Sequence, residues 1–348
     1  MHNNPKNVHI NLISKNNNIN TSILHTDDTV PMEEEKDNLP KPNSNLNYIN
    51  LQSIQTTANS NEFNMQTSIS NDSIKSQNSL DEATIIEESY TFKSEYFEEL
   101  YQNLILDEQY FNEKINHKYM SFQRNINYKM RAILVDWLID VHFHCNFKQK
   151  TLFQCIFIID AFLSKINIEK VNFQLLGIAA LLISCKENET IYPSLKKFVE
   201  LTDNAYEIEE LLFMEKKILQ ILKYDIFGPT AEEFYHINAE YFGFNEEQKF
   251  FGEYFLECSL INYDMLKYNM STIAVACGYI TMKYYKLEGV HIIFENCAPG
   301  VKEKEIKNCA RDLCFLVRNL SKSSLGAAKN KYISEKFFKV AKLCEEKK

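Results

Sequence analysis

The stretch Met130-Arg-Ala-Ile-Leu-Val-Asp-Trp-Leu-Ile-Asp140 decides the fold, and it holds the only tryptophan of the chain. One set of its apolar residues recurs at helical spacing, and other apolar residues cover the opposite side. A helix at a protein surface has one apolar stripe, so a helix that is apolar on most sides is buried or meets a partner. Two interpretations follow: the whole helix is core, or one side is core and the side with the tryptophan is a docking patch.

Single charged residues stand inside the apolar stretches. Arg131 lies in the helix just described, and Asp160 lies in Ile156-Phe-Ile-Ile-Asp-Ala-Phe-Leu163. A lone charge in apolar surroundings is costly unless it is paired, so we expect a salt bridge between the two helices. Lys186 and Glu215 also stand in helical segments, where an ordinary solvated charge is the simpler interpretation.

Helical spacing continues on both sides of this stretch, and Gly228-Pro229 interrupts it. We predict an all-α chain with two five-helix domains, at residues 127–228 and 229–342. A helix and linker over residues 89–126 precede them, after a disordered tail over residues 1–88 that is rich in Asn, Ser and acids. The expected helices span residues 127–144, 149–164, 171–187, 194–201, 206–222, 230–242, 246–263, 270–286, 303–319 and 330–342.

Composition and charge exclude several classes of protein. Residues 1–90 hold five lysines, no arginine and twelve acids, so seven of the nine net negative charges fall there. The remaining chain is close to neutral, whereas a nucleic-acid-binding domain is expected to be basic. The sequence contains no run of about 18 apolar residues, the length that a membrane-spanning helix needs. The nine cysteines stand apart without a CxxC pair, which is typical of a reducing compartment.

Motifs of catalysis and metal binding are absent from the sequence. It has no glycine-rich phosphate loop and no GxSxG elbow. His142-x-His144-Cys145 resembles a partial metal site, but residues two apart on a helix point to different faces and no second ligand pair follows. We therefore expect no cofactor and no metal.

The stretch from Met130 to His142 resembles the opening of the cyclin box in A- and B-type cyclins almost letter for letter. The resemblance extends over about residues 90–340, and Asn116-His-Lys-Tyr-Met120 favours the B type. It implies a tandem cyclin-box fold. Further matching residues are Tyr206, Met214-Glu215, Leu222-Lys-Tyr-Asp225, Pro229-Thr230 and Lys331-Tyr-Ile-Ser-Glu-Lys-Phe337.

This resemblance implies a regulatory subunit rather than an enzyme. Such a subunit binds and allosterically activates a cyclin-dependent kinase catalytic subunit, recruits Arg-x-Leu substrates or inhibitors, and controls the G2/M transition. It implies a location in nucleus and cytoplasm, with no nucleic acid or membrane as partner. The alternatives are an A-type S-phase cyclin and, more remotely, a cyclin-fold transcription adaptor.

The resemblance also assigns roles to residues. Arg131 and Asp160 match positions that brace the cyclin box, while Lys186 and Glu215 match positions that hydrogen-bond backbone groups around the kinase's regulatory helix. The residues implied to bind the kinase are Lys186, Glu215, Leu219, Tyr224, Tyr96, Leu100 and Leu175. The residues implied to form the substrate-docking patch are Met130, Ile133, Leu134, Trp137, Asp140, Phe173 and Gln174. Phe173 replaces the more usual Leu.

Two departures from the family pattern concern the loop after Lys186 and the tail. The segment from Lys186 to Pro193 is one residue longer than usual, and Glu187 stands where an aromatic or apolar residue is expected. Residues 1–90 contain no arginine and so no Arg-x-x-Leu destruction box. Lys186-Glu-Asn188 spells another degron, but its place at a helix end inside the cyclin box favours a coincidence.

Overall fold

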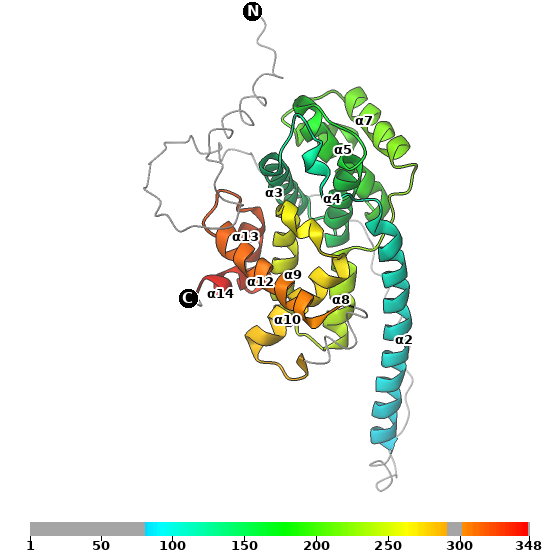
Figure 1. Cartoon of the computed structure of the whole chain (residues 1–348), viewed down its shortest axis with the longest axis vertical. Helices are drawn as coiled ribbons and strands as arrows, with labels where there is room; N and C mark the ends of the chain where they lie inside the picture. Colours follow the sequence, from blue (N-terminus) through cyan, green and yellow to red (C-terminus); the bar gives the residue numbers. More distant parts are fainter. Residues whose placement is uncertain (1–80, 291–300, 347–348) are drawn as a thin grey trace, which may run out of the picture. The chain divides into compact units, whose positions relative to one another are not determined.

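The computed structural model describes residues 81–290 and 301–346, with side chains from residue 97 to residue 345. Every regular element in these ranges is a helix, which confirms the all-α class (Figure 1). Helix α2 (Asp81–Asn112) begins inside the segment expected to be disordered up to residue 88. Residues 1–80 lie outside the described part, so disorder there stays a prediction.

The first domain contains five helices, and α4 is the central one. The residues of α4 from Thr151 to Leu163 are all buried. A helix with apolar residues on every side fits only at the centre, where α4 packs on α5 and both contact α7. Gly177 of α5 lets α3 approach closely, because a Cβ there would lie 2.8 Å from Cδ1 of Leu134. The helices are α3 (Tyr128–His144), α4 (Gln149–Leu163), α5 (Phe173–Asn188), α6 (Leu195–Glu200) and α7 (Ile208–Ile221).

The second domain repeats this plan around α9 and α10, which are also largely buried. The helix expected over residues 330–342 is divided into two short helices by a 3₁₀ turn. The first helix ends before Ser334, whose backbone is extended, and Phe338 and Lys339 then adopt left-handed backbone, with φ of 52° and 55°, before the second helix begins. The described helices are α8 (Ala231–Tyr241), α9 (Glu246–Ile261), α10 (Met270–Tyr285), α12 (Glu303–Leu320), α13 (Ala327–Tyr332) and α14 (Val340–Glu346).

Side chains at the helix starts fix where the domains begin. Asn127 caps α3 by accepting a hydrogen bond of 3.0 Å from the Met130 backbone N–H. Thr230 and Glu233 form a capping box at α8, directly after Pro229, so the new helix begins where the proline ends the preceding chain. No described helix is both long enough and apolar enough to cross a lipid bilayer.

Helix α2 is attached to the second domain and to the segment between the domains. The ring of Phe97 stacks on Tyr241 with centroids 4.3 Å apart. Glu108 accepts hydrogen bonds from the backbone N–H and the hydroxyl of Ser271, at 2.8 and 2.7 Å, and so supplies an acid to the start of α10. Gly228 leaves room for the Phe111 ring, which a Cβ would approach to 2.6 Å.

Candidate functional site

A buried ion pair joins α3 to α4. Arg131 donates from Nε to Oδ1 of Asp160 at 2.7 Å and from Nη2 to Oδ2 at 2.6 Å. Tyr119 donates its hydroxyl to the same carboxylate at 2.7 Å. Arg131 also donates from Nη1 to the carbonyl of Leu260 in α9, at 2.8 Å, so the pair connects both domains. Burial alone would lower the pKa of Arg131, but Asp160 and Tyr119 outweigh it and hold the pKa above its ordinary value.

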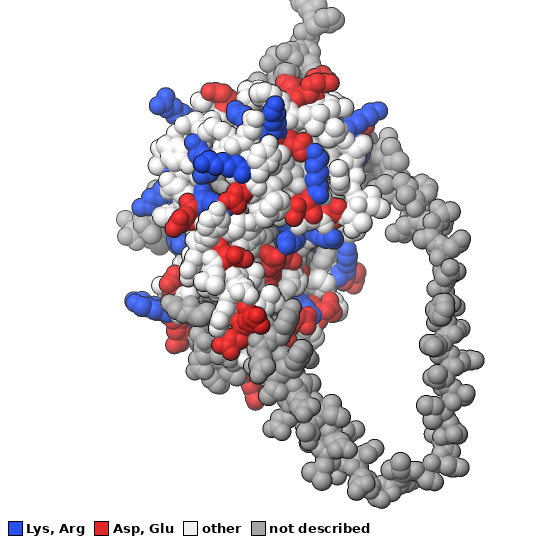
Figure 2. Space-filling model, turned by 90° about the vertical axis from the view of Figure 1, so that its right-hand side faces the viewer, with Lys and Arg blue, Asp and Glu red and all other residues white. Residues whose placement is uncertain are grey.

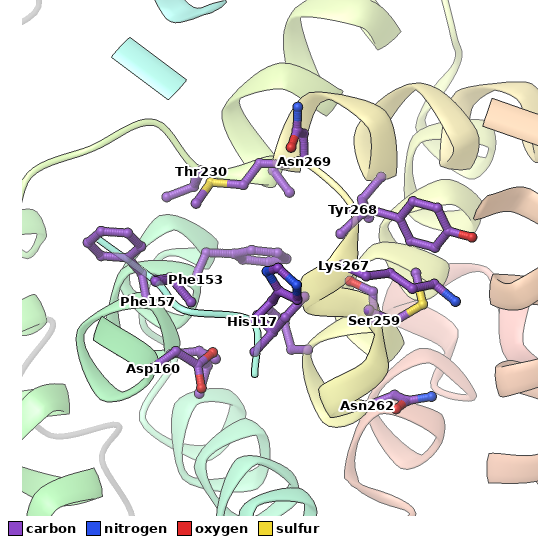
Figure 3. Close-up of a pocket in the computed structure, with 18 of the residues that line it drawn as sticks. His117, Phe153, Phe157, Asp160, Thr230, Ser259, Asn262, Lys267, Tyr268 and Asn269 are labelled. Carbon is purple, nitrogen blue, oxygen red and sulfur yellow. The ribbon is translucent and has the colours of Figure 1, made fainter. Parts of the chain in front are cut away.

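A cavity of about 330 Å³ lies between the two domains beside this pair (Figure 3). Phe153, Phe157 and Asp160 line it from α4, and Ser259 lines it from α9. None of the residues predicted to bind the kinase or a substrate motif lines this cavity. The cavity therefore belongs to the scaffold between the domains rather than to the predicted binding surfaces.

Lys186, in the last turn of α5, lies next to Glu215, in the middle of α7. Lys186 Nζ lies 2.5 Å from Glu215 Oε1, and the two side chains are 38% and 12% exposed. Leu219 follows Glu215 by one helical turn and is half-buried. The Tyr224 backbone N–H donates to the carbonyl of Leu219 at 2.8 Å, and its side chain is 63% exposed. The structure therefore brings these four residues into one surface, which we call the α5–α7 surface.

The other residues predicted to bind the kinase lie in different surroundings. Leu175 is only 5% exposed and packs in the core of the first domain, because it faces inward from the buried helix α5. It lies near the start of α5, whereas Lys186 lies near its end, and it offers little area to a partner. Leu100 lies half-buried on α2. Tyr96 is also on α2, but its side chain lies outside the described residues.

Exposed apolar residues that the sequence reasoning missed lie on α7 and in the loop after α5. Phe213 is 69% exposed, and Leu212 beside it is also exposed. In the loop, Ile191 is 88% exposed and is followed by the exposed Tyr192. The signal was the run Leu211-Leu-Phe-Met214: a helix with one buried face cannot bury four consecutive apolar residues.

The longer loop after Lys186 begins at an anchored point. The Glu189 carboxylate accepts hydrogen bonds from the Lys148 backbone N–H at 2.7 Å and from the Thr151 hydroxyl at 2.5 Å. Lys148 Nζ in turn donates to the carbonyl of Asn188 at 2.6 Å. The Glu189 end of the loop is thus attached to the start of α4, and the exposed Ile191 follows two residues later.

The predicted docking patch on α3 divides into a floor and a rim. Met130, Leu134 and Phe173 are buried, so they form the floor. Ile133, Trp137 and Gln174 are partly exposed, and Asp140 is exposed at the end of the same face. The tryptophan side of α3 is therefore neither fully core nor fully surface, which is the arrangement that a shallow apolar docking site requires.

Helix α13 of the second domain is fixed against α3 next to this patch. Asp136 accepts a hydrogen bond of 3.0 Å from the Ala327 backbone N–H at the start of α13. Burial, together with the nearby Asp140, raises the pKa of Asp136 to about 6. Farther along α13, Lys331 forms a buried ion pair with Glu257 of α9 at 2.7 Å. Residues 191 positions apart meet here, and no local pattern in the sequence indicated it.

The histidines that resembled a partial metal site have separate partners. His142 is buried with Nε2 3.0 Å from the Lys148 carbonyl, and burial lowers its pKa. His144 is exposed and lies against Asp140, with Nδ1 3.3 Å from Oδ1. Within residues 81–290 and 301–346, no three His, Cys, Asp or Glu side chains are grouped as metal ligands.

The comparisons with known proteins agree on one family. The family model of the cyclin N-terminal domain matches residues 99–227, and that of the cyclin C-terminal domain matches residues 230–346. A viral cyclin from herpesvirus saimiri superposes with a TM-score of 0.56 over 63% of this chain and 96% of its own, at 18% identity. That similarity shows a shared fold.

Curated relatives agree in sequence. The G2/mitotic-specific cyclin-B of Hydra vulgaris is 35% identical over 64% of this chain and 62% of its own length. The G2/mitotic-specific cyclin-B2 of Homo sapiens is 34% identical over 71% of this chain and 62% of its own length. The chain thus spans less than two thirds of these relatives, but the two domain models cover most of it. The chain belongs to the cyclin family.

Proposed function

We propose that this cyclin is a regulatory subunit of the mitotic B type, which binds and allosterically activates a cyclin-dependent kinase at the G2/M transition. The α5–α7 surface carries the proposal, because it combines a partly exposed ion pair with exposed apolar side chains on a rigid domain. The names of the relatives, G2/mitotic-specific cyclins B and B2, support the B type.

The ion pair of this surface is suited to exchange its partners. Lys186 and Glu215 bond each other in the free chain, yet Lys186 is 38% exposed, and an ion pair of this kind contributes only about 0–1 kcal/mol. Opening it therefore costs little. Lys186 Nζ can then donate to a carbonyl of the kinase, and the Glu215 carboxylate can accept from a backbone N–H.

Apolar contacts supply most of the binding free energy in this proposal. Burying a large apolar side chain of this surface, such as Leu219 or Tyr224, stabilises a complex by about 1.5–3 kcal/mol. If the active arrangement of the kinase's regulatory helix makes these contacts and the inactive one does not, binding shifts the kinase toward the active state. That helix carries the glutamate of the kinase's own Lys–Glu ion pair. No residue of the cyclin then performs chemistry, so we propose that the chain is not an enzyme.

The patch on α3 is the proposed site for Arg-x-Leu motifs of substrates and inhibitors. The leucine of such a motif would pack on the floor of Met130, Leu134 and Phe173, beside Trp137. Asp140 is exposed and would pair with the arginine. Docking raises the effective concentration of a tethered substrate at the kinase without any new chemistry.

The distribution of charge on the protein surface fits a protein partner better than a nucleic acid. On the face that Figure 2 shows, Lys and Arg side chains alternate with Asp and Glu, and uncharged surface separates them. A nucleic-acid site is instead expected to form a continuous basic patch or stripe. We further propose that the protein works in both nucleus and cytoplasm, as mitotic cyclins do.

The test is reconstitution with a mitotic cyclin-dependent kinase subunit and a histone phosphorylation assay. We expect the wild-type chain to activate the kinase and Lys186→Ala/Glu215→Ala to activate it much less. The matched control is Lys197→Ala/Glu200→Ala, which removes an exposed ion pair of α6 outside the proposed surface. A wild-type chain that neither binds nor activates the kinase would refute the function. Equal losses in both variants would refute the assignment of the surface.

A further inference from the structure

The outward face of α12 carries basic side chains along its length, and nothing in the proposed function uses them. Lys304, Lys307, Arg311 and Arg318 are exposed, and Phe315 stands among them with 61% of its surface exposed. At 3.6 residues per turn, these five positions fall within about 80° of the helix circumference. We call them the α12 basic face.

The opposite face of α12 is fully used by the fold. Its apolar residues pack on α9 and α10, which lie beside it in Figure 1. The basic face is therefore held on a rigid helix and needs no ordering before it binds. The buried residues are Ile306, Cys309, Ala310, Leu313, Leu316 and Val317.

Helix stability explains only part of this arrangement of charges, because it accounts for Arg318 in the last turn and for the pair of Lys307 with Glu303. Lys304 lies in the first turn of α12, where a cation is unfavourable beside the helix dipole. Lys307 and Arg311 are like charges four residues apart, a spacing that destabilises a helix. Lys307 pairs with Glu303, and Arg311 donates to the Asn308 side chain at 2.8 Å.

Two of the cations are left available for a ligand. Within the ranges whose side chains the structure describes, Lys304 and Arg318 make no ion pair. Both lie on a chain whose net charge is −9, so their positive field is a local feature. Surplus cations around an exposed aromatic ring point to an anionic ligand with an apolar part.

We propose that the α12 basic face binds an acidic peptide segment of a partner protein, with a bulky apolar residue of that segment packed on Phe315. The carboxylates of the partner would pair with Lys304 and Arg311 on the N-terminal side of the ring and with Arg318 on its C-terminal side. From Lys304 to Arg318 the face is about 21 Å long, the length of a short peptide. This binding is separate from the α5–α7 surface and from kinase activation.

A peptide is favoured over the two other classes of anionic partner. Glu305 and Asp312 border the basic face along one edge, and they would repel a polyanion wider than the face. A single exposed aromatic ring also provides only one stacking platform for nucleotide bases, where several are typical. A lipid surface would require the apolar face of α12, which is buried in the domain.

The probe is a fluorescently labelled peptide of about ten residues, in which glutamates flank two central leucines. Its binding to the full chain is measured by fluorescence anisotropy. The test variants are Arg311→Glu/Arg318→Glu and, separately, Phe315→Ser. The control Lys118→Glu/Lys196→Glu makes the same change in net charge at exposed lysines elsewhere. All altered side chains are exposed, so circular dichroism should show unchanged folding. Poly-uridine RNA and phosphatidylserine vesicles serve as competing probes.

We expect the peptide to bind the wild type and the control alike, and to bind the double reversal at least about tenfold more weakly. Binding should weaken with added salt and with Phe315→Ser. Equal binding to the double reversal, or no binding to the wild type, would overturn the proposal. Tighter binding of RNA or vesicles than of the peptide, lost in the same variant, would assign the face to that other class of partner. We expect kinase activation to be unchanged in all of these variants.

Discussion

Removing Asp160 tests whether the buried pair holds the cyclin scaffold together. The substitution Asp160→Ala deletes the acceptor of three hydrogen bonds, two from Arg131 and one from Tyr119. Arg131 is then left as a buried charge that still donates to the carbonyl of Leu260. An uncompensated charge in the interior is among the most destabilising changes known for a folded protein.

The expected cost follows from the geometry. Breaking a buried ion pair by deleting one partner costs about 3–5 kcal/mol. The orphaned Tyr119 hydroxyl adds about 1 kcal/mol, although such terms are not additive among neighbours. We therefore expect a loss of about 4 kcal/mol and a melting temperature lower by roughly 10 °C. The double variant Arg131→Met/Asp160→Ala removes both charges and should recover about 2 kcal/mol of that loss.

Urea unfolding followed by circular dichroism measures these differences. Asp225→Ala is the matched control, because Asp225 pairs with Lys114 at 2.5 Å but its side chain is 38% exposed. That variant should lose less than about 1 kcal/mol. If Asp160→Ala is no more destabilised than the control, or if the double variant is less stable than Asp160→Ala, the pair does not brace the fold as argued.

Three further predictions concern the core, the binding surface and pH. Gly252→Ala should destabilise the chain by about 3 kcal/mol, because a Cβ would lie 2.0 Å from the Tyr235 hydroxyl; Gly326→Ala, where the nearest atom is 3.6 Å away, should not lower the melting temperature comparably. Tyr224→Ala, at an exposed residue of the α5–α7 surface, should weaken kinase binding about tenfold in titration calorimetry and change stability by less than about 0.5 kcal/mol. Burial raises the pKa of Glu253 from 4.5 to about 8. The folded state therefore holds the extra proton, and stability falls as pH rises between those values; Glu253→Gln should flatten that slope in melting temperatures measured across it.

The helices were predictable because their apolar periodicity is strong and local. Helix α3 was expected over residues 127–144 and spans Tyr128–His144. The error over residues 330–342 has a local cause of another kind. A left-handed residue at a helix end is usually glycine or asparagine, and here Phe338 and Lys339 take that conformation without either signal. Phe337 and Val340 on either side are both buried, so the segment is held by tertiary packing.

The site was predictable where a residue's own chemistry demanded a partner. Arg131 in an apolar helix required an acid, and Asp160 was the candidate in the next helix. The depth of apolar residues was not predictable, since Leu175 and Phe213 are both apolar helical residues and differ only in what packs over them. Glu108 with Ser271 and Asp136 with Ala327 are 163 and 191 residues apart, so no local spacing connects them.

These long-range bonds bear on how a cyclin activates a kinase. Arg131 joins α3 to the carbonyl of Leu260, Asp136 joins α3 to α13, and Glu108 joins α2 to α10, so three separate contacts tie sequence-distant elements together. A surface carried on such a scaffold is already formed before the partner arrives, and little binding free energy is lost to ordering it. In the proposed complex the kinase would therefore be the partner that changes shape, because the differential contacts would act on its mobile helix and not on a mobile cyclin. On the proposed function, mutations of the three contacts should therefore weaken activation even though none of their residues belongs to the α5–α7 surface.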